Sequence, residues 1–114
     1  MDNVVKDKSF RFSVRIVKLC RFLQDVKKEP VMSKQLLRCG TSIGANIAES
    51  QHAQSRPDFL SKLNIALKEA AETDYWLRLL YETDYLTKEQ FSSIMSDCDE
   101  LESLLVSIVK TTKN

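Results

Sequence analysis

The sequence predicts an all-α protein that folds as an antiparallel up-down-up-down four-helix bundle. Only two glycines and two prolines occur in 114 residues, so long helices are rarely interrupted. Apolar residues recur at alternating spacings of three and four in four segments, the period of a helix with one buried face. Short turns between the segments make successive helices antiparallel neighbours. We expect one domain, residues 1–114, with helices at about 8–27, 31–54, 56–82 and 88–111.

The first expected helix carries two apolar stripes and one basic stripe. Its core seam comprises Phe12, Ile16, Leu19, Leu23 and Val26. A second apolar stripe, directed away from the seam, comprises Phe10, Val14 and Val17. This second stripe is expected either to contact another protomer or to cover a flank of the bundle. The basic stripe comprises Lys8, Arg11, Arg15 and Lys18.

The second expected helix contains both glycines of the protein. It follows Glu29-Pro30, because proline disfavours helical geometry in the residue before it. Gly40 and Gly44 lie on its apolar side, with Ala48 one turn further on. A glycine inside a helix costs roughly 1 kcal/mol relative to alanine, and close approach of a neighbour is the usual reason for it. We interpret the three residues as a helix-packing motif, since neither the spacing nor a preceding strand fits a phosphate-binding loop.

The polar side of the same helix has three interpretations. Its stripe comprises Arg38, Ser42, Asn46 and Glu49. The stripe is a solvated face, or a partly buried interface in which Arg38 pairs with Glu69 or Glu72 of the third helix or with a neighbouring protomer. In the third interpretation Arg38 contacts phosphate together with Lys34 and the cations of the first helix.

The last two helices carry both seams and start signals. The third helix has the seam Phe59, Leu63, Ala66, Ala70, Thr73, Leu77 and Leu80. Ser55 is expected to cap it, with Pro57 and Asp58 in its first turn. The fourth helix has the seam Phe91, Ile94, Cys98, Leu101, Leu105 and Ile108. Thr87 and Gln90 have the spacing of a capping box at its start.

The residues predict neither a catalytic nor a metal site. Glu49 and His52 have the Glu-x-x-His spacing of di-iron bundles, but such a site needs a second pair, and His52 is the single histidine. No serine lies in a strand-turn-helix elbow. The cysteines, Cys20, Cys39 and Cys98, are widely spaced and odd in number, which indicates reduced, packed thiols. We therefore expect a non-enzymatic protein without a cofactor, a metal or a small-molecule substrate.

The charge is distributed unevenly along the chain. Residues 1–56 carry 11 Lys and Arg against 5 Asp and Glu, whereas residues 57–114 carry 6 against 11. A basic half can attract phosphate or an acidic partner, and it can equally meet the acidic half of a neighbouring protomer. No apolar stretch reaches the length of a membrane span and no signal peptide begins the chain, so a cytoplasmic protein without membrane contact is expected.

Two runs resemble a known family. They are Gln35-Leu36-Leu37-Arg38 with Thr41-Ser42-Ile43-Gly44-Ala45-Asn46-Ile47-Ala48-Glu49, and Ala66-Leu67-Lys68-Glu69-Ala70-Ala71-Glu72-Thr73-Asp74-Tyr75-Trp76-Leu77. They resemble the bacterial four-helix bundle proteins first noticed as reading frames within intervening sequences of large-subunit ribosomal RNA genes. That family is similar to the accessory protein of diversity-generating retroelements, a basic pentameric barrel that binds a reverse transcriptase and nucleic acid. The resemblance implies a homo-oligomer, such as a pentamer, and RNA, DNA or a reverse transcriptase as partners.

These observations lead to one functional hypothesis and one alternative. The hypothesis is a non-enzymatic, oligomeric nucleic-acid or ribonucleoprotein accessory protein. Its expected phosphate contacts are Lys8, Arg11, Arg15, Lys18, Lys34 and Arg38. The alternative is a protein–protein scaffold that binds no nucleic acid, in which the same cations serve solubility or pairing between subunits.

Overall fold

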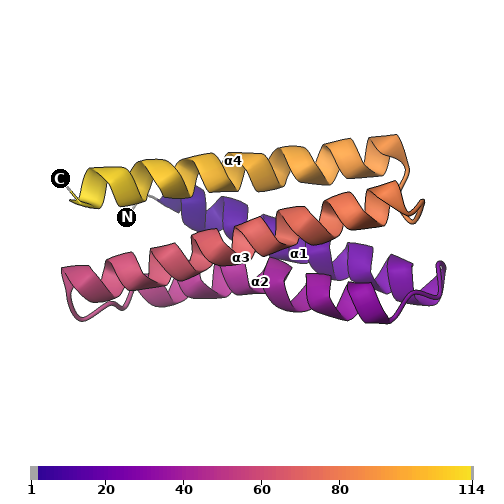
Figure 1. The fold of residues 1–114 in the computed structure, drawn as a ribbon. Helices are drawn as coiled ribbons and strands as arrows, with labels where there is room; N and C mark the ends of the chain where they lie inside the picture. The colour runs from indigo at the N-terminus through magenta and orange to yellow at the C-terminus, as the bar shows by residue number, and fades with distance from the viewer. Residues whose placement is uncertain (1–2, 114) are drawn as a thin grey trace.

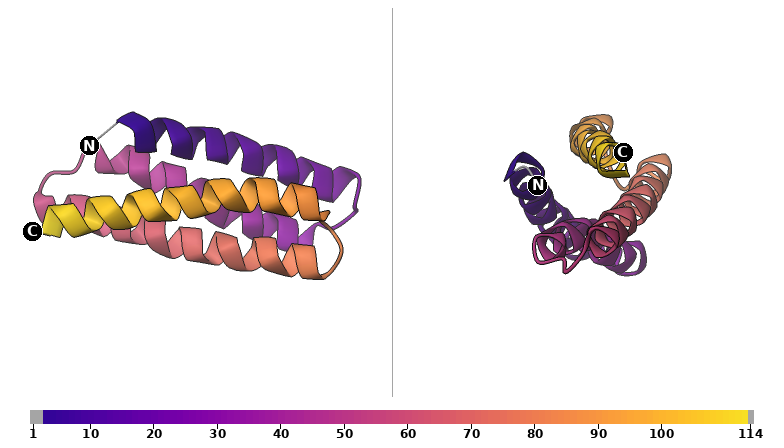
Figure 2. Two further views of the ribbon diagram at one scale, coloured as in Figure 1. Left: turned by 90° about the horizontal axis from the view of Figure 1, so that it is seen from above. Right: turned by 90° about the vertical axis from the view of Figure 1, so that its left-hand side faces the viewer.

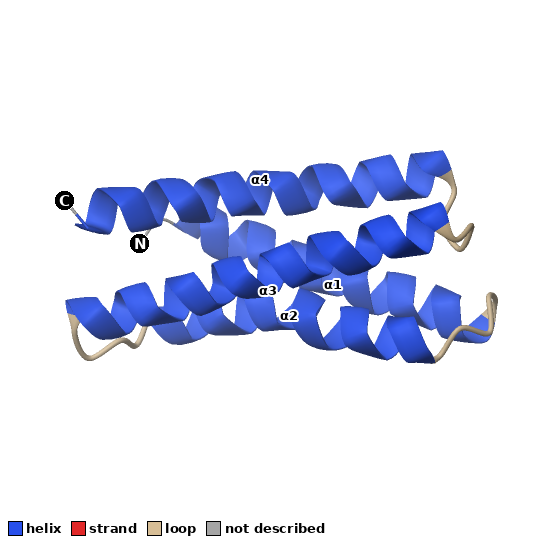
Figure 3. Ribbon diagram, viewed as in Figure 1, coloured by secondary structure: helices blue, strands red, loops and turns tan. Residues whose placement is uncertain are grey.

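The computed structural model describes residues 3–113 and confirms the antiparallel four-helix bundle. The helices are α1 (Asn3–Asp25), α2 (Val31–Ser50), α3 (Arg56–Glu82) and α4 (Lys88–Lys113), arranged along one long axis (Figure 1). The described residues contain no strand, and turns join the helices (Figure 3). Both ends of the chain lie at the same end of the bundle, as four antiparallel helices require (Figure 1). The bundle measures 44 × 20 × 19 Å.

The core lies where the predicted seams meet. In α3 the seam from Leu63 to Leu80 is buried throughout, and in α4 Ile94, Cys98 and Leu101 are buried with it. The end-on view shows α2 beside both α1 and α3, and α4 beside α3 (Figure 2). Burial of these apolar side chains is the main favourable term in the stability of such a bundle.

The limits of α1 differ from the prediction of about 8–27. The helix already includes Asn3, because Val5 lies one heptad before Phe12 and is only 1% exposed, which extends the buried seam. At the other end the helix stops at Asp25, and Lys28 has a positive φ of 56°. Val26 lies beyond the helix and is 63% exposed, so its predicted place in the core seam is wrong.

The start of α2 has a cap that the sequence pattern did not reveal. The carboxylate of Glu29 accepts hydrogen bonds from the backbone N–H of Met32 at 2.8 Å and of Ser33 at 3.1 Å. These are donors that the helix itself leaves unpaired. The helix ends at Ser50 rather than near Gln54, because the N–H groups of residues 51–53 bond to carbonyls three residues back instead of four.

The predicted start signals of α3 and α4 are confirmed. Ser55 Oγ accepts from the N–H of Asp58 at 3.1 Å, so Ser55 caps α3. At α4, Thr87 Oγ1 accepts from the N–H of Gln90 at 3.1 Å, and Gln90 Oε1 accepts from the N–H of Thr87 at 2.9 Å. This reciprocal pair is a capping box. The last helix continues to Lys113, slightly beyond the expected end near Thr111.

Candidate functional site

Gly40 and Gly44 lie on the side of α2 that faces α1. A Cβ atom added at Gly40 would be 2.8 Å from Ile16 Cγ2, and one added at Gly44 would be 2.8 Å from Ser13 Oγ and 3.2 Å from the Ser9 carbonyl oxygen. Neither glycine has a positive φ, so close approach of the two helices explains them and backbone conformation does not.

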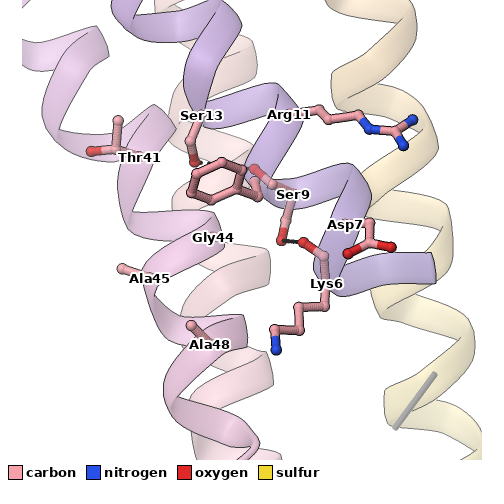
Figure 4. A pocket seen from close by; sticks show the side chains of 10 residues that line it. Lys6, Asp7, Ser9, Arg11, Ser13, Thr41, Gly44, Ala45 and Ala48 are labelled. Atoms are coloured by element: carbon pink, nitrogen blue, oxygen red, sulfur yellow. Dashed lines mark hydrogen bonds between the residues drawn. The ribbon is translucent and has the colours of Figure 1, made fainter. Parts of the chain in front are cut away.

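A groove opens between α1 and α2 where this contact ends. Its volume is about 670 Å³, and Figure 4 shows its walls. The groove is lined by Lys6, Asp7, Ser9, Phe10, Arg11, Ser13, Thr41, Gly44, Ala45 and Ala48. Ala48 is exposed, so its predicted place in the packing motif is wrong within the chain, where only Gly40 and Gly44 lie against α1. A step of four residues turns the side-chain direction by about 40° around the helix, which carries Ala48 away from the face that contacts α1.

The second apolar stripe of α1 reaches the same groove at Phe10. Phe10 is 70% exposed and Val14 is 39% exposed, whereas Val17 is partly buried. The stripe was expected to contact another protomer or to cover a flank of the bundle. Only Val17 is buried enough for the second role. Phe10 and Val14 are exposed apolar residues on the outer side of the helix.

The polar stripe of α2 faces α3, and Arg38 pairs within the chain. Its guanidinium contacts the carboxylates of Glu69, at 3.5 Å, and Glu72. The Glu72 carboxylate also accepts from Trp76 Nε1 at 3.1 Å. These contacts correspond to the interface interpretation of the stripe, with α3 as the partner. They also occupy the guanidinium that the third interpretation assigned to phosphate.

The other members of the stripe differ in burial. Asn46 is 9% exposed, and its Nδ2 donates to the carbonyl oxygen of Ser42 at 2.9 Å, so Asn46 does not belong to a solvated face. Glu49 lies near the end of the helix, and its carboxylate is 3.4 Å from Lys62 Nζ. Exposed pairs of this kind contribute about 0–1 kcal/mol.

Two cations of the basic stripe pair with α4. Lys8 Nζ lies 2.7 Å from Glu100 Oε1, and Arg15 Nη1 lies 2.6 Å from Asp97 Oδ2. Arg15 Nη2 also donates to Ser93 Oγ at 2.9 Å. The basic half of the chain thus meets part of its acidic half within one molecule. Contact with a phosphate at these two positions would have to displace an existing pair.

Other cations form an exposed basic end at the α1–α2 turn. Cys20 Sγ donates to the Ser33 carbonyl oxygen at 3.3 Å, which sets the start of α2 level with the last turns of α1. Lys34 lies in that part of α2, and Lys18 and Arg21 lie in that part of α1. Among residues 3–113, these three cations form no ion pair with a carboxylate. The basic end comprises Lys18, Arg21, Lys27, Lys28 and Lys34, all of them exposed.

The basic end contains residues that the sequence analysis missed. Arg21, Lys27 and Lys28 lie outside the regular stripe of α1, and Lys27 and Lys28 follow the end of the helix. Arg11 lies nearer the start of α1, away from the turn, and it lines a second hollow with Asp97 and Glu100. Of the six predicted phosphate contacts, only Lys18 and Lys34 belong to this end, and Lys18 lies on the side of α1 that faces α4.

An acidic cluster lies on the outer side of α3 and α4. Carboxylate oxygens of Asp74, Asp99 and Glu102 lie within 4.8 Å of one another. Arg78 pairs with Asp74 at the edge of this cluster. Burial, followed by repulsion from Asp74, raises the pKa of Glu102. The three carboxylates therefore carry more negative charge than Arg78 compensates. The sequence pattern did not predict that these three groups would lie together.

Within residues 3–113, the three cysteine thiols and the histidine occupy different environments. Cys20, Cys39 and Cys98 are all buried and free, and burial raises the pKa of Cys20 to about 12. A buried thiol with a raised pKa is a poor nucleophile at neutral pH. His52 is exposed in the turn after α2, and Glu49, three residues before it, contacts Lys62. Of the helices in the described part of the chain, none combines the length and the apolar character needed to cross a bilayer.

The fold and its surfaces define a class: an all-helical bundle whose distinctive features are outer charged and apolar surfaces. Residues 1–107 match the family described as 23S rRNA-intervening sequence protein, and the chain belongs to that family. It is also similar to a crystal structure of a protein of unknown function from the S23 ribosomal protein family of Bacteroides thetaiotaomicron. The two share 64% sequence identity over 96% of this chain and 97% of that one, with a TM-score of 0.94. A comparison with curated proteins found no match.

Proposed function

We propose that the chain is a non-enzymatic, self-associating accessory protein that binds RNA through the basic end at the α1–α2 turn. The exposed cations near this turn support the proposal. Lys18, Arg21 and Lys34 form no ion pair among the described residues, so contact with a phosphate would not have to break an existing pair. Membership of a family named for ribosomal RNA intervening sequences supports RNA as the nucleic acid.

Self-association is the second part of the proposal. One basic end offers only a few phosphate contacts, and the formal net charge of the chain is +1, so binding by a single copy should be weak. Several copies held together would present several basic ends to one RNA. Linked binding of this kind can strengthen the overall affinity by orders of magnitude without any new type of contact.

Substitution of the basic end tests RNA binding directly. Replacing Lys18, Arg21 and Lys34 by Ala should weaken binding to single-stranded RNA and flatten its dependence on salt. If each cation neutralises one phosphate, the slope of log K against log salt should fall in magnitude by about 2. Fluorescence anisotropy over a series of salt concentrations measures both quantities.

A matched control separates the basic end from net charge. Replacing Lys68, Lys88 and Lys110 by Ala removes the same charge from exposed positions on α3 and α4. This control should retain the salt slope of the unaltered protein. If the two triple variants weaken RNA binding equally, the basic end is not the binding surface. If neither variant nor the unaltered protein binds RNA, the scaffold alternative is favoured.

A further inference from the structure

A hollow on the seam between α1 and α4 adjoins the basic end. Its volume is about 280 Å³. This α1/α4 hollow is lined by Arg15, Lys18, Leu19, Phe22, Gln90 and Ile94. On α1 it reaches from Arg15 to Phe22, within the last turns of a helix that ends at Asp25. Lys18 belongs both to the hollow and to the basic end, so the two adjoin there.

The hollow contains two planar side-chain groups. One is the partly buried ring of Phe22, and Lys27 of the basic end lies over it, with Nζ 6.0 Å from the ring centroid. The other is the guanidinium of Arg15. Aromatic rings and Arg guanidinium planes are the groups on which unpaired bases stack in RNA-binding proteins. The apolar side chains of Leu19 and Ile94 complete the wall.

Arg15 can stack on a base without losing its ion pair. Its Nη1 lies 2.6 Å from Asp97 Oδ2 and its Nη2 donates to Ser93 Oγ at 2.9 Å, so α4 fixes the orientation of the guanidinium. These bonds use the N–H groups at the edge of the planar group, whereas a stacked base contacts its face. A phosphate would have to displace Asp97, but a base would not.

The charge of the hollow favours a ligand that carries phosphate. Lys18 is exposed and forms no ion pair among the described residues. The lining residues of this hollow include no carboxylate. In the neighbouring hollow on the same seam, by contrast, Asp97 and Glu100 accompany two cations. Negative charge is therefore accommodated better at the end of the seam near the α1–α2 turn.

The size and the remaining polar group of the hollow fit a single base. Pockets for drug-sized ligands measure roughly 300–1,000 Å³, so this smaller hollow suits one planar ring system rather than a whole nucleotide. Gln90 Oε1 accepts from the N–H of Thr87 in the capping box. Its Nε2 remains to donate a hydrogen bond to the edge of a base.

We propose that the α1/α4 hollow receives one unpaired base of an RNA strand whose phosphates contact the basic end. Phe22 and Arg15 stack on the base, and Lys18 contacts the adjacent phosphate. The protein therefore binds single-stranded RNA more tightly than duplex RNA, because the faces of paired bases are covered by their neighbours in the duplex. This inference rests on the proposed function and specifies the form of RNA.

Substitution of Phe22 tests the stacking. Phe22→Leu keeps an apolar side chain but removes the planar ring, so it should weaken binding of oligo(U) by roughly fivefold to tenfold. The slope of log K against log salt should stay the same, because no charge is removed. Binding of oligo(U) paired with oligo(A) should hardly change. Fluorescence anisotropy at several salt concentrations measures all three.

Phe91→Leu is the matched control. Phe91 is also partly buried and lies at the same end of the bundle, near the start of α4 (Figure 1). Its ring stacks on Tyr81, with 4.5 Å between the centroids, and it does not line the hollow. Urea unfolding checks that both variants fold. Equal affinity of the two variants for oligo(U) would overturn the inference.

Gln90→Glu tests the polar wall of the hollow. Glutamate serves as well as glutamine in a capping box, so the start of α4 is retained, but the amide donor is lost and a negative charge enters the hollow. Oligo(U) should bind several-fold more weakly. Gln54→Glu adds the same charge at an exposed position at the opposite end of the bundle and should have a smaller effect (Figure 1). Equal effects of the two substitutions would show that RNA does not enter the hollow.

The same measurements distinguish failure of this inference from failure of the proposed function. An unaltered protein that binds neither oligo(U) nor the duplex would refute both. Equal binding of the two RNAs, unaffected by Phe22→Leu but weakened by loss of Lys18, Arg21 and Lys34, would refute only the base site. Uridine monophosphate should compete weakly, since it brings a single phosphate. Competition as strong as that of unlabelled oligo(U) would assign the hollow to a free nucleotide and overturn the inference.

Discussion

The two flanks of α1 hold their neighbours in different ways. Toward α2, the absence of side chains at Gly40 and Gly44 lets the helices approach closely, and Ile16 fills the space over Gly40. Toward α4, Lys8 and Arg15 reach across to Glu100 and Asp97, and hollows of about 280 and 160 Å³ remain along the seam. Contact of α1 with α2 therefore depends on shape. Contact of α1 with α4 depends in part on charge, in addition to the apolar core that all four helices share. The first should be insensitive to salt, and the second should weaken as salt increases.

The largest expected effect is on the flank that depends on shape. Gly40→Leu should lower the free energy of unfolding by about 1–3 kcal/mol or more, because the new side chain would overlap the buried Ile16. Gly44→Leu should cost less, since Gly44 also borders the open groove. Urea unfolding measures both changes. Neither change should depend on salt.

Ala45→Leu is the control for this flank. Ala45 lies on the same helix and is exposed, so the substitution should change stability by no more than about 0.5 kcal/mol. If Gly40→Leu proves as harmless as this control, the spacing of α1 and α2 does not depend on the glycine.

The sequence could predict the flank that depends on shape but not the one that depends on charge. With only two glycines in the chain, their place on an apolar helix face indicated close approach without reference to the partner. A helical wheel also places Lys8 and Arg15 on one side of α1. It does not show which residues of a neighbouring helix lie opposite that side. Their pairing with Glu100 and Asp97 depends on the register of α1 against α4, residues more than eighty positions apart.

The polar stripe of α2 shows what made a pairing predictable. One of the three interpretations pairs Arg38 with Glu69 or Glu72, and Arg38 contacts both, because α2 and α3 are joined by a short turn that restricts their register. The basic end was missed for the opposite reason. Arg21, Lys27 and Lys28 follow no helical period, and the turn places Lys27 and Lys28 between the end of α1 and the start of α2 that carries Lys34.

A smaller effect is expected on the flank that depends on charge. Arg15→Ala and Asp97→Asn should each lower the unfolding free energy modestly, and a double-mutant cycle should give a coupling of about 0.2–1 kcal/mol. Both side chains are partly exposed, at 40% and 46%, which keeps the coupling small. Thermal or urea unfolding at low and high salt measures it. The coupling should shrink in 1 M salt.

Lys18→Ala provides the comparison for Arg15. Lys18 lies on the same side of α1 but forms no ion pair within the described part of the chain, so its loss should leave stability nearly unchanged. A coupling between Arg15 and Asp97 that is zero at low salt would mean that packing rather than charge also secures the α4 flank.

The smallest expected change in the free energy of unfolding comes from two glutamates on α4 that lie in different surroundings. Glu100 pairs with Lys8, whereas Glu102 lies beside Asp74 and Asp99 and has a raised pKa. A raised folded-state pKa means that ionised Glu102 costs stability above that pKa, and that the cost disappears as the pH falls to the ordinary value of 4.5. Glu102→Gln should therefore stabilise the protein at pH 7–8, by about 0.2–1 kcal/mol because the cluster is partly solvated, and should have no effect near pH 4.

The same substitution at Glu100 should have the opposite sign at neutral pH. Glu100→Gln removes an attraction to Lys8, so it should destabilise the protein slightly, while Glu102→Gln removes a repulsion. Both variants change the net charge equally, so a difference in sign cannot come from net charge. Urea unfolding at pH 7.5 and pH 4 measures the two variants side by side. If both shift stability in the same direction at pH 7.5, the local charge arrangement on α4 does not control its docking onto α1 and α3.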